Sequence, residues 1–215
     1  MEQPLLDLRL LRDRLFRGTV VVIGLSTACF LGMLYLAPIF LQETHHQTPL
    51  SSGLTTFVEA FGVIVASQSL AHLYLRVGPR VMTAIGSMAV TALLVSFAFI
   101  TAHTSLWTIR IEMFLLGGFN SAIFLSVQSS TFTNISRERT GHATAIYTTQ
   151  RQAAIPVGIA ILTSVVTTVH GSQLQRFHAA FIAAATLAAL TGVAGITLIR
   201  TADALPSMRR SSIPT

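Results

Sequence analysis

Charged residues and cysteine are scarce in this chain. Only 10% of its 215 residues are charged, whereas soluble domains carry about 25%. Lysine is absent, and the single cysteine, Cys29, excludes an intrachain disulfide and a cysteine-based metal cluster. Hydrophobic residues make up 52% of the chain, and its mean hydropathy is +0.66. Water is therefore not the main solvent of this protein.

The apolar residues fall into runs of about 20, long enough to cross a hydrocarbon core of about 30 Å as helices. They predict an all-α, polytopic membrane bundle of about six transmembrane helices. The predicted spans are Thr19–Leu41, Ser51–Leu75, Val81–Thr101, Leu106–Thr131, His142–Val169 and His178–Ile199. We expect a cytoplasmic lead-in over residues 1–18, a transmembrane domain over 19–200 and a cytoplasmic tail of disordered composition over 201–215.

The arginines mark alternate connections between these spans. Arginine clusters occupy positions 9–17, 76–80, 137–139 and 200–210, whereas the intervening connections contain only Arg176. Cytoplasmic loops carry the arginine excess, so the pattern predicts a multi-pass protein of the cell membrane with both termini cytoplasmic. Short clusters between apolar runs do not form a phosphate-binding face. A nucleic-acid partner is therefore not expected, despite a pI near 11.0.

Motifs of catalysis and cofactor binding are missing as well. The chain contains no H-E-x-x-H, G-x-S-x-G or Walker phosphate loop, so neither an enzyme nor an ATP-driven pump is expected, and no cofactor is expected. His45 and His46 lie beside Glu43 in a predicted outer connection. Three adjacent side chains rarely converge on one ion, so we expect a solvated loop there and no metal site.

Ionisable side chains at the centre of a bilayer cost at least about 2.5 to 3.5 kcal/mol, so each is a candidate functional residue. Glu59 and Arg151 both fall near the middle of predicted spans, at depths that would let them meet. We expect Glu59 to bind the coupling proton or a cationic substrate, with Arg151 as its partner. The alternative is a structural ion pair that only holds helices together.

Other polar residues have two interpretations each. Arg110 and Glu112 follow Trp107 near an outer end, where such residues either have a functional role inside the span or anchor at lipid headgroups, as they commonly do. Asn120 and Gln128 belong to a polar stripe on the fourth predicted span. Thr144 and Thr148 form a second stripe, on the fifth predicted span before Arg151. Such stripes either line a substrate path or tie helices together.

The run Tyr147–Ala160 contains Arg151 and Gln152, followed by Gly158 and Ala160. It resembles the penultimate helix of the fourteen-helix drug:proton antiporter family of the major facilitator superfamily, where a run of the type N-x-x-R-Q-x-G-x-x-x-G-x-A is typical. The segments Pro4–Leu11, Leu36–Gln42 and Ser51–Leu54 resemble that family's segments around its ninth and tenth helices, in the same order. The chain departs from the family in Ala153 and Ala154, where glycines are frequent, and in Pro156, which predicts a kink.

The turn Arg76-Val77-Gly78-Pro79-Arg80 resembles the short basic turn between paired helices of this superfamily. Gly78 and Pro79 favour a tight turn, and Arg76 and Arg80 favour contact with helix C-termini or anionic groups. The turn either latches one conformation or is an ordinary positive-inside anchor.

The resemblance implies proton-coupled export of lipophilic or cationic small molecules by alternating access. Membrane lipids, protons and a small-molecule substrate are the expected partners. It also implies a fold of two halves, of which this chain resembles the C-terminal one. A missing N-terminal half or a second copy is then a further expected partner. The alternative is a fragment or membrane assembly partner that does not transport by itself.

Overall fold

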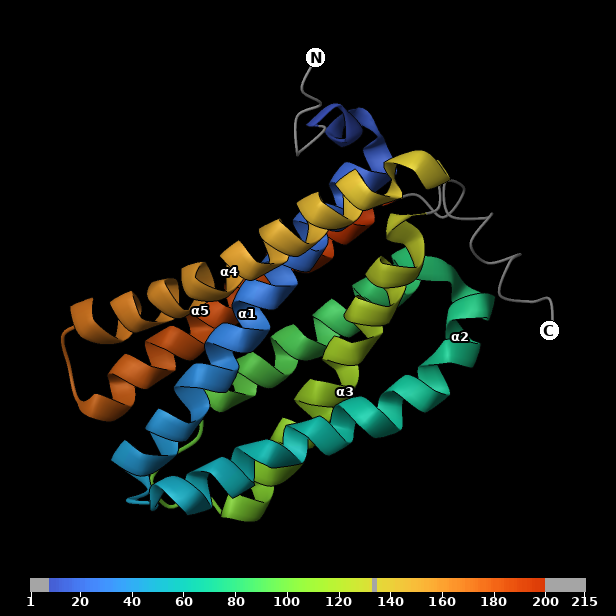
Figure 1. Ribbon diagram of the computed structural model, residues 1–215. Coiled ribbons are helices and arrows are strands. Elements are labelled where there is room, and N and C mark those ends of the chain that lie inside the picture. The colour runs from blue at the N-terminus through green and yellow to red at the C-terminus, as the bar shows by residue number, and fades with distance from the viewer. Residues whose placement is uncertain (1–7, 133–134, 200–215) are drawn as a thin grey trace.

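The computed structural model describes residues 8–132 and 135–199, and throughout this part of the chain the secondary structure is helical (Figure 1). Two short 3₁₀ helices, η1 (Leu8–Arg12) and η2 (Arg137–Arg139), precede α1 and α4. The α-helices are α1 (Arg14–Thr44), α2 (Pro49–Phe97), α3 (Leu106–Thr131), α4 (Thr140–Thr168) and α5 (Gln173–Leu198). The expected all-α class is confirmed. The predicted tail, 201–215, lies outside the described residues.

The long helix α2 comprises two membrane spans, Pro49–Leu70 and Arg76–Phe97. The helix is broken by a kink at Gly78, near the start of the second span, where φ is 76° and ψ is 168°, a conformation that glycine adopts far more readily than other residues. With this division, six helices are long and apolar enough to cross a membrane. The prediction of six spans is confirmed, including a break at Gly78.

Side chains in the connections explain where several helices begin. The Asp13 carboxylate accepts a hydrogen bond from the Phe16 amide at 2.7 Å, so α1 starts several residues before the predicted span. Ser172 and Gln175 form a reciprocal capping box at the start of α5. The helix α4 runs from Thr140 to Thr168 through Pro156, so the proline does not end it.

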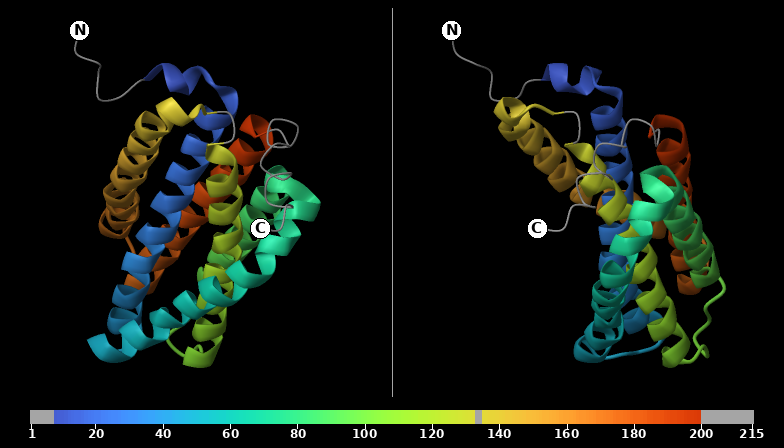
Figure 2. Two further views of the ribbon diagram at one scale, coloured as in Figure 1. Left: turned by 45° about the vertical axis from the view of Figure 1, so that its right-hand side comes forward. Right: turned by 90° about the vertical axis from the view of Figure 1, so that its right-hand side faces the viewer.

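The spans pack in an arrangement that Figure 2 makes visible. In its right-hand view, α5 and the second span of α2 lie together on one side, and α1 and α3 lie in the middle. The helix α4 packs on α1, and the first span of α2 packs on α3, toward the other side. The helix α4 and the first span of α2 therefore flank the central pair instead of packing on each other.

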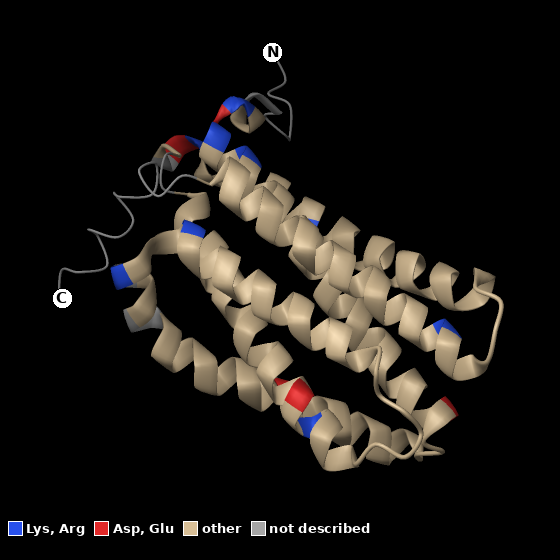
Figure 3. Ribbon diagram, turned by 180° about the vertical axis from the view of Figure 1, so that it is seen from behind, with Lys and Arg blue, Asp and Glu red and all other residues tan. Residues whose placement is uncertain are grey.

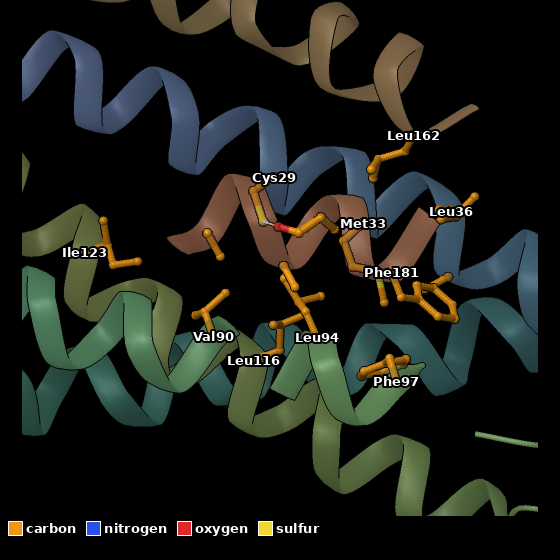
Figure 4. Close-up of a cluster of buried hydrophobic side chains, with 14 of the residues drawn as sticks. Cys29, Met33, Leu36, Val90, Leu94, Phe97, Leu116, Ile123, Leu162 and Phe181 are labelled. Carbon is orange, nitrogen blue, oxygen red and sulfur yellow. Dashed lines mark hydrogen bonds between the residues drawn. The ribbon is translucent and has the colours of Figure 1, made fainter. Parts of the chain in front are cut away.

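The core lies where α1, α3, α5 and the second span of α2 meet (Figure 4). Phe40, Phe97 and Phe181 are fully buried, and the Phe181 ring lies 5.1 Å from that of Phe40 and 5.4 Å from that of Phe97. Cys29 donates a hydrogen bond to the Ala184 carbonyl at 3.3 Å. Lipid tails are as apolar as these side chains, so close packing rather than exclusion of water holds this core together.

Basic residues gather at the end of the bundle where α1 begins and α5 ends (Figure 3). There the Arg14 guanidinium donates to the Thr197 carbonyl at 3.1 Å, which joins the start of α1 to the last turn of α5. The other end contains the connections after α1, α2 and α4. The connections thus lie alternately at the two ends of the bundle, as expected for helices that cross a membrane in alternating directions. The cytoplasmic location of the basic end stays a prediction.

The orientation can be tested by cysteine labelling. We expect Glu43→Cys and Ser136→Cys, each in a Cys29→Ala background, to react with a membrane-impermeant maleimide from opposite sides of the membrane. Both positions are exposed, and they lie at opposite ends of the bundle. The Ser136 position should react only after the inner face is opened to the reagent. Equal reactivity of both positions in sealed cells would contradict the predicted topology.

Candidate functional site

Glu59 lies midway along the first span of α2 and is only 5% exposed. Its backbone and side chain press against Gly117 of α3, where an added Cβ would collide with the Glu59 carbonyl oxygen and Cγ. Among the described residues, the structure gives its carboxylate neither a hydrogen bond nor an ion pair. An acidic group is therefore held midway along its span, and none of the described cations contacts it.

Asn120 lies one turn after Gly117 on α3 and is 2% exposed. Its Oδ1 accepts a hydrogen bond from the Ser26 hydroxyl of α1 at 3.1 Å. Its Nδ2 is buried and has no partner within the described part of the chain. The hydroxyl oxygens of Thr27 and Thr55 are also buried without a partner among the described residues. Three neighbouring helices thus bury polar atoms whose hydrogen-bonding capacity is unused, which is uncommon in folded proteins.

Arg151 is exposed on α4, roughly 16 Å along the helix axis from Thr140. Its guanidinium carbon lies 5.3 Å from the centre of the Phe124 ring of α3, a cation–π distance. The Phe124 ring meets Phe30 of α1 edge to face, with 5.9 Å between centres. The structure does not bring Arg151 to Glu59. The reason is that α4 packs on α1 and the first span of α2 packs on α3, so the central pair separates them.

The residue before Arg151 was not singled out from the sequence. Gln150 points toward α1, where its side-chain amide occupies the space that a Cβ at position 24 would need. Its Oε1 is buried without a partner among the residues described. The sequence signal for this contact was a small residue, Gly24, in the first span and a long polar one, Gln150, in the fifth. Nothing in either span alone indicates that the two positions face each other.

The two polar stripes divide between buried and exposed positions. On α3, Asn120 and Thr131 are buried, and Thr131 donates to the Val127 carbonyl at 2.6 Å, whereas Gln128 is exposed. On α4, Thr144 and Thr148 are both exposed. Gln128 and the threonines of α4 are therefore available to a ligand, whereas the Thr131 hydroxyl is bonded to a carbonyl of its own helix.

Arg110 and Glu112 have different environments. Arg110 stacks over the Trp107 ring at 4.8 Å, and Trp107 is 69% exposed, which fits an anchor at the headgroups. Glu112 turns inward instead and accepts a hydrogen bond from the Ser96 hydroxyl at 3.0 Å. Its other oxygen is buried, with no partner in the described chain. Glu112 is thus a second interior carboxylate.

The predicted cytoplasmic turn contains both exposed and buried residues. Arg76 and Arg80 are exposed, while Gly78 and Pro79 between them are buried. At the other end of the bundle, the His45 ring packs edge-on against Phe40, with 5.7 Å between centres. Burial lowers the pKa of His45, and the neighbouring His46 lowers it further.

Comparison with known proteins explains this architecture. The family model for the major facilitator superfamily matches residues 19–213. The chain belongs to the major facilitator superfamily. Its six-helix bundle corresponds to half of the fold of that superfamily, and the family points to a transporter rather than an enzyme.

Individual relatives in this superfamily are distant. The multidrug resistance protein Stp of Mycobacterium tuberculosis is 28% identical over 75% of this chain and 30% of its own length. The uncharacterized transporter YhcA of Bacillus subtilis is 26% identical over 80% of this chain and 33% of its own length. The multidrug resistance protein B homolog of Mycobacterium tuberculosis is 23% identical over 90% of this chain and 35% of its own length. The chain thus spans about a third of the length of these relatives.

Proposed function

We propose that this chain provides six helices of a drug exporter of the fourteen-helix drug:proton antiporter family. In this proposal it exports lipophilic small molecules by alternating access, driven by protons. The names of two relatives, both multidrug resistance proteins, support the substrate class. The observation that carries the proposal is the buried Glu59 carboxylate, which lies near mid-depth with no cation beside it.

The coupling rests on the cost of a charge at this depth. A charged glutamate at the centre of a span costs about 2.5 to 3.5 kcal/mol or more. In the conformation described here, a bound proton removes that cost, because no described cation contacts Glu59. Loss of the proton requires contact with water or a cation, which a second conformation provides. A conformational change that opens this site to one side of the membrane at a time then couples proton movement to transport.

Asn120 and Gln128 are the proposed substrate contacts on α3. The Asn120 amide has an unused donor beside the contact between Glu59 and Gly117, and Gln128 is exposed two turns further along the helix. Arg76 and Arg80 are proposed to hold the cytoplasmic turn against anionic groups in one conformation, as Gly78 permits the tight turn between them.

The test is transport in liposomes that contain the purified chain together with six further helices of a relative. We expect an acidic lumen to drive uptake of a fluorescent lipophilic dye, and we expect a protonophore to abolish the uptake. Protein-free liposomes and liposomes without a pH difference are the controls. Dye movement that is insensitive to the protonophore would contradict proton coupling.

A second candidate function follows from the exposed surface of the flanking helices. Phe57 and Phe61 are more than half exposed on the first span of α2, and Arg151 and Gln152 are exposed on α4. Such a surface suits a membrane assembly partner that transports nothing by itself. No dye movement by the chain, either alone or co-reconstituted with six further helices of a relative, would favour this function.

A further inference from the structure

Arg151 presents a positive charge near the middle of its helix without an ion pair to any described residue, and every described carboxylate is engaged or buried elsewhere. Asp13 caps α1, Glu43 accepts a hydrogen bond from Gln173 at 2.5 Å, and Glu112 accepts one from Ser96. Glu59 is buried against α3, and Glu138 lies in η2 at the basic end. None of these five acids forms an ion pair with Arg151.

The surroundings of Arg151 contain hydrogen-bond donors and an aromatic surface. Thr148 lies one turn before it on the same face of α4 and is exposed. Phe124 lies beneath the guanidinium, and Phe30 extends the aromatic surface toward α1. Gln128 is exposed one turn beyond Phe124 on α3. These groups match a molecule that has aromatic rings and one anionic group.

An unpaired arginine at this depth favours an anionic ligand for an energetic reason. A lone charge inside a bilayer is costly, and a counter-charge at contact distance removes much of that cost. The guanidinium also offers a planar fork of donors that suits carboxylate and sulfonate oxygens. A phospholipid phosphate stays at headgroup level, roughly half the thickness of the hydrocarbon core away from Arg151.

We propose that Arg151, Thr148 and Phe124 form a subsite for the anionic group of an aromatic substrate. Arg151 is then a specificity-determining residue, which selects organic anions from among lipophilic molecules. Because Glu59 is separated from this subsite, proton binding and anion binding occur at different places on the two flanking helices. This inference rests on the proposed export function and narrows its substrate class.

The test compares two dyes that share one ring system. Anilinonaphthalene sulfonate carries a negative charge, and N-phenylnaphthylamine is the same aromatic amine without the sulfonate. We expect Arg151→Gln to weaken binding of the sulfonate to the purified chain by about tenfold, the size of one lost charge-assisted hydrogen bond. Binding of the neutral dye should change less than twofold, and Arg151→Lys should retain most of the binding of the sulfonate.

The matched control is Arg176→Gln, which removes an exposed arginine at the start of α5. It should leave the binding of both dyes unchanged. Equal weakening of both dyes by Arg151→Gln, or no weakening of either dye, would overturn the subsite, as would an equal effect of the control. Circular dichroism of each variant checks the fold, and Arg151→Met removes the same charge if the glutamine variant does not fold. Because binding needs no transport, a failure of the export function and a failure of the subsite give different results.

Discussion

Glu59→Gln should abolish proton-driven dye transport in liposomes, down to the level of protein-free vesicles. Glutamine has the size of glutamate and keeps the contact with Gly117, but it neither gains nor loses a proton at ordinary pH. The conformational change would then no longer be coupled to proton movement. The measurement is the initial rate of dye uptake after a pH jump, at equal amounts of reconstituted protein.

The matched control is Glu43→Gln. Glu43 is exposed at the end of α1, and its hydrogen bond joins it to Gln173 outside the membrane core. We expect this variant to transport at the rate of the unaltered chain. If Glu59→Gln transported equally well, Glu59 would be a packing residue and the coupling proposal would be wrong. A comparison with Glu112→Gln then shows whether the second interior carboxylate carries the proton.

Gly62→Ala should lower the melting temperature of the purified chain by about 5 °C, because even one added carbon collides with backbone. A Cβ at position 62 would meet the Phe114 carbonyl of α3, and backbone cannot rotate away as a side chain can. Forcing helices apart in this way costs about 1 to 3 kcal/mol, and each kcal/mol corresponds to about 2 to 4 °C for a chain of this size. Thermal unfolding followed by circular dichroism measures the effect.

Gly53→Ala is the control with the opposite expected sign. Gly53 lies in the same span of α2, and no atom lies within 4 Å of a Cβ built there. Alanine favours a helix over glycine by about 0.5 to 1 kcal/mol, so this variant should melt at the same temperature or slightly higher. Equal destabilisation by both substitutions would show that the close contact between α2 and α3 does not hold the bundle together.

The two acidic residues illustrate how far the sequence leads. Glu59 was placed at mid-depth by counting along an apolar run, and the structure places it midway along its span. Glu112 was expected near an outer end because Trp107 and Arg110 precede it, but its hydrogen bond from Ser96 could not be read from the sequence. Depth follows from position in a run, whereas the direction of a side chain around the helix depends on its neighbours.

The expected meeting of Glu59 and Arg151 shows the same limit. Both depths were predictable, but the pairing required α2 and α4 to be neighbours. The structure instead places α1 and α3 between them, where Gly117 admits the Glu59 backbone and Gly158 admits the Ala28 backbone. The stacking of Arg151 on Phe124 depends on this arrangement of helices and has no sign in the sequence.

The sequence by itself determined the six crossings, the break at Gly78 and the gathering of arginines at one end. A bilayer of fixed thickness requires apolar runs of a certain length, and that requirement is visible in one dimension. Only the tertiary structure decided which helices are neighbours and which polar atoms stay unpaired. Lipid is as apolar as the protein interior, so apolar periodicity does not distinguish a buried helix face from a lipid-facing one. Close contacts at single glycines decide which face of a helix is buried and which faces the lipid.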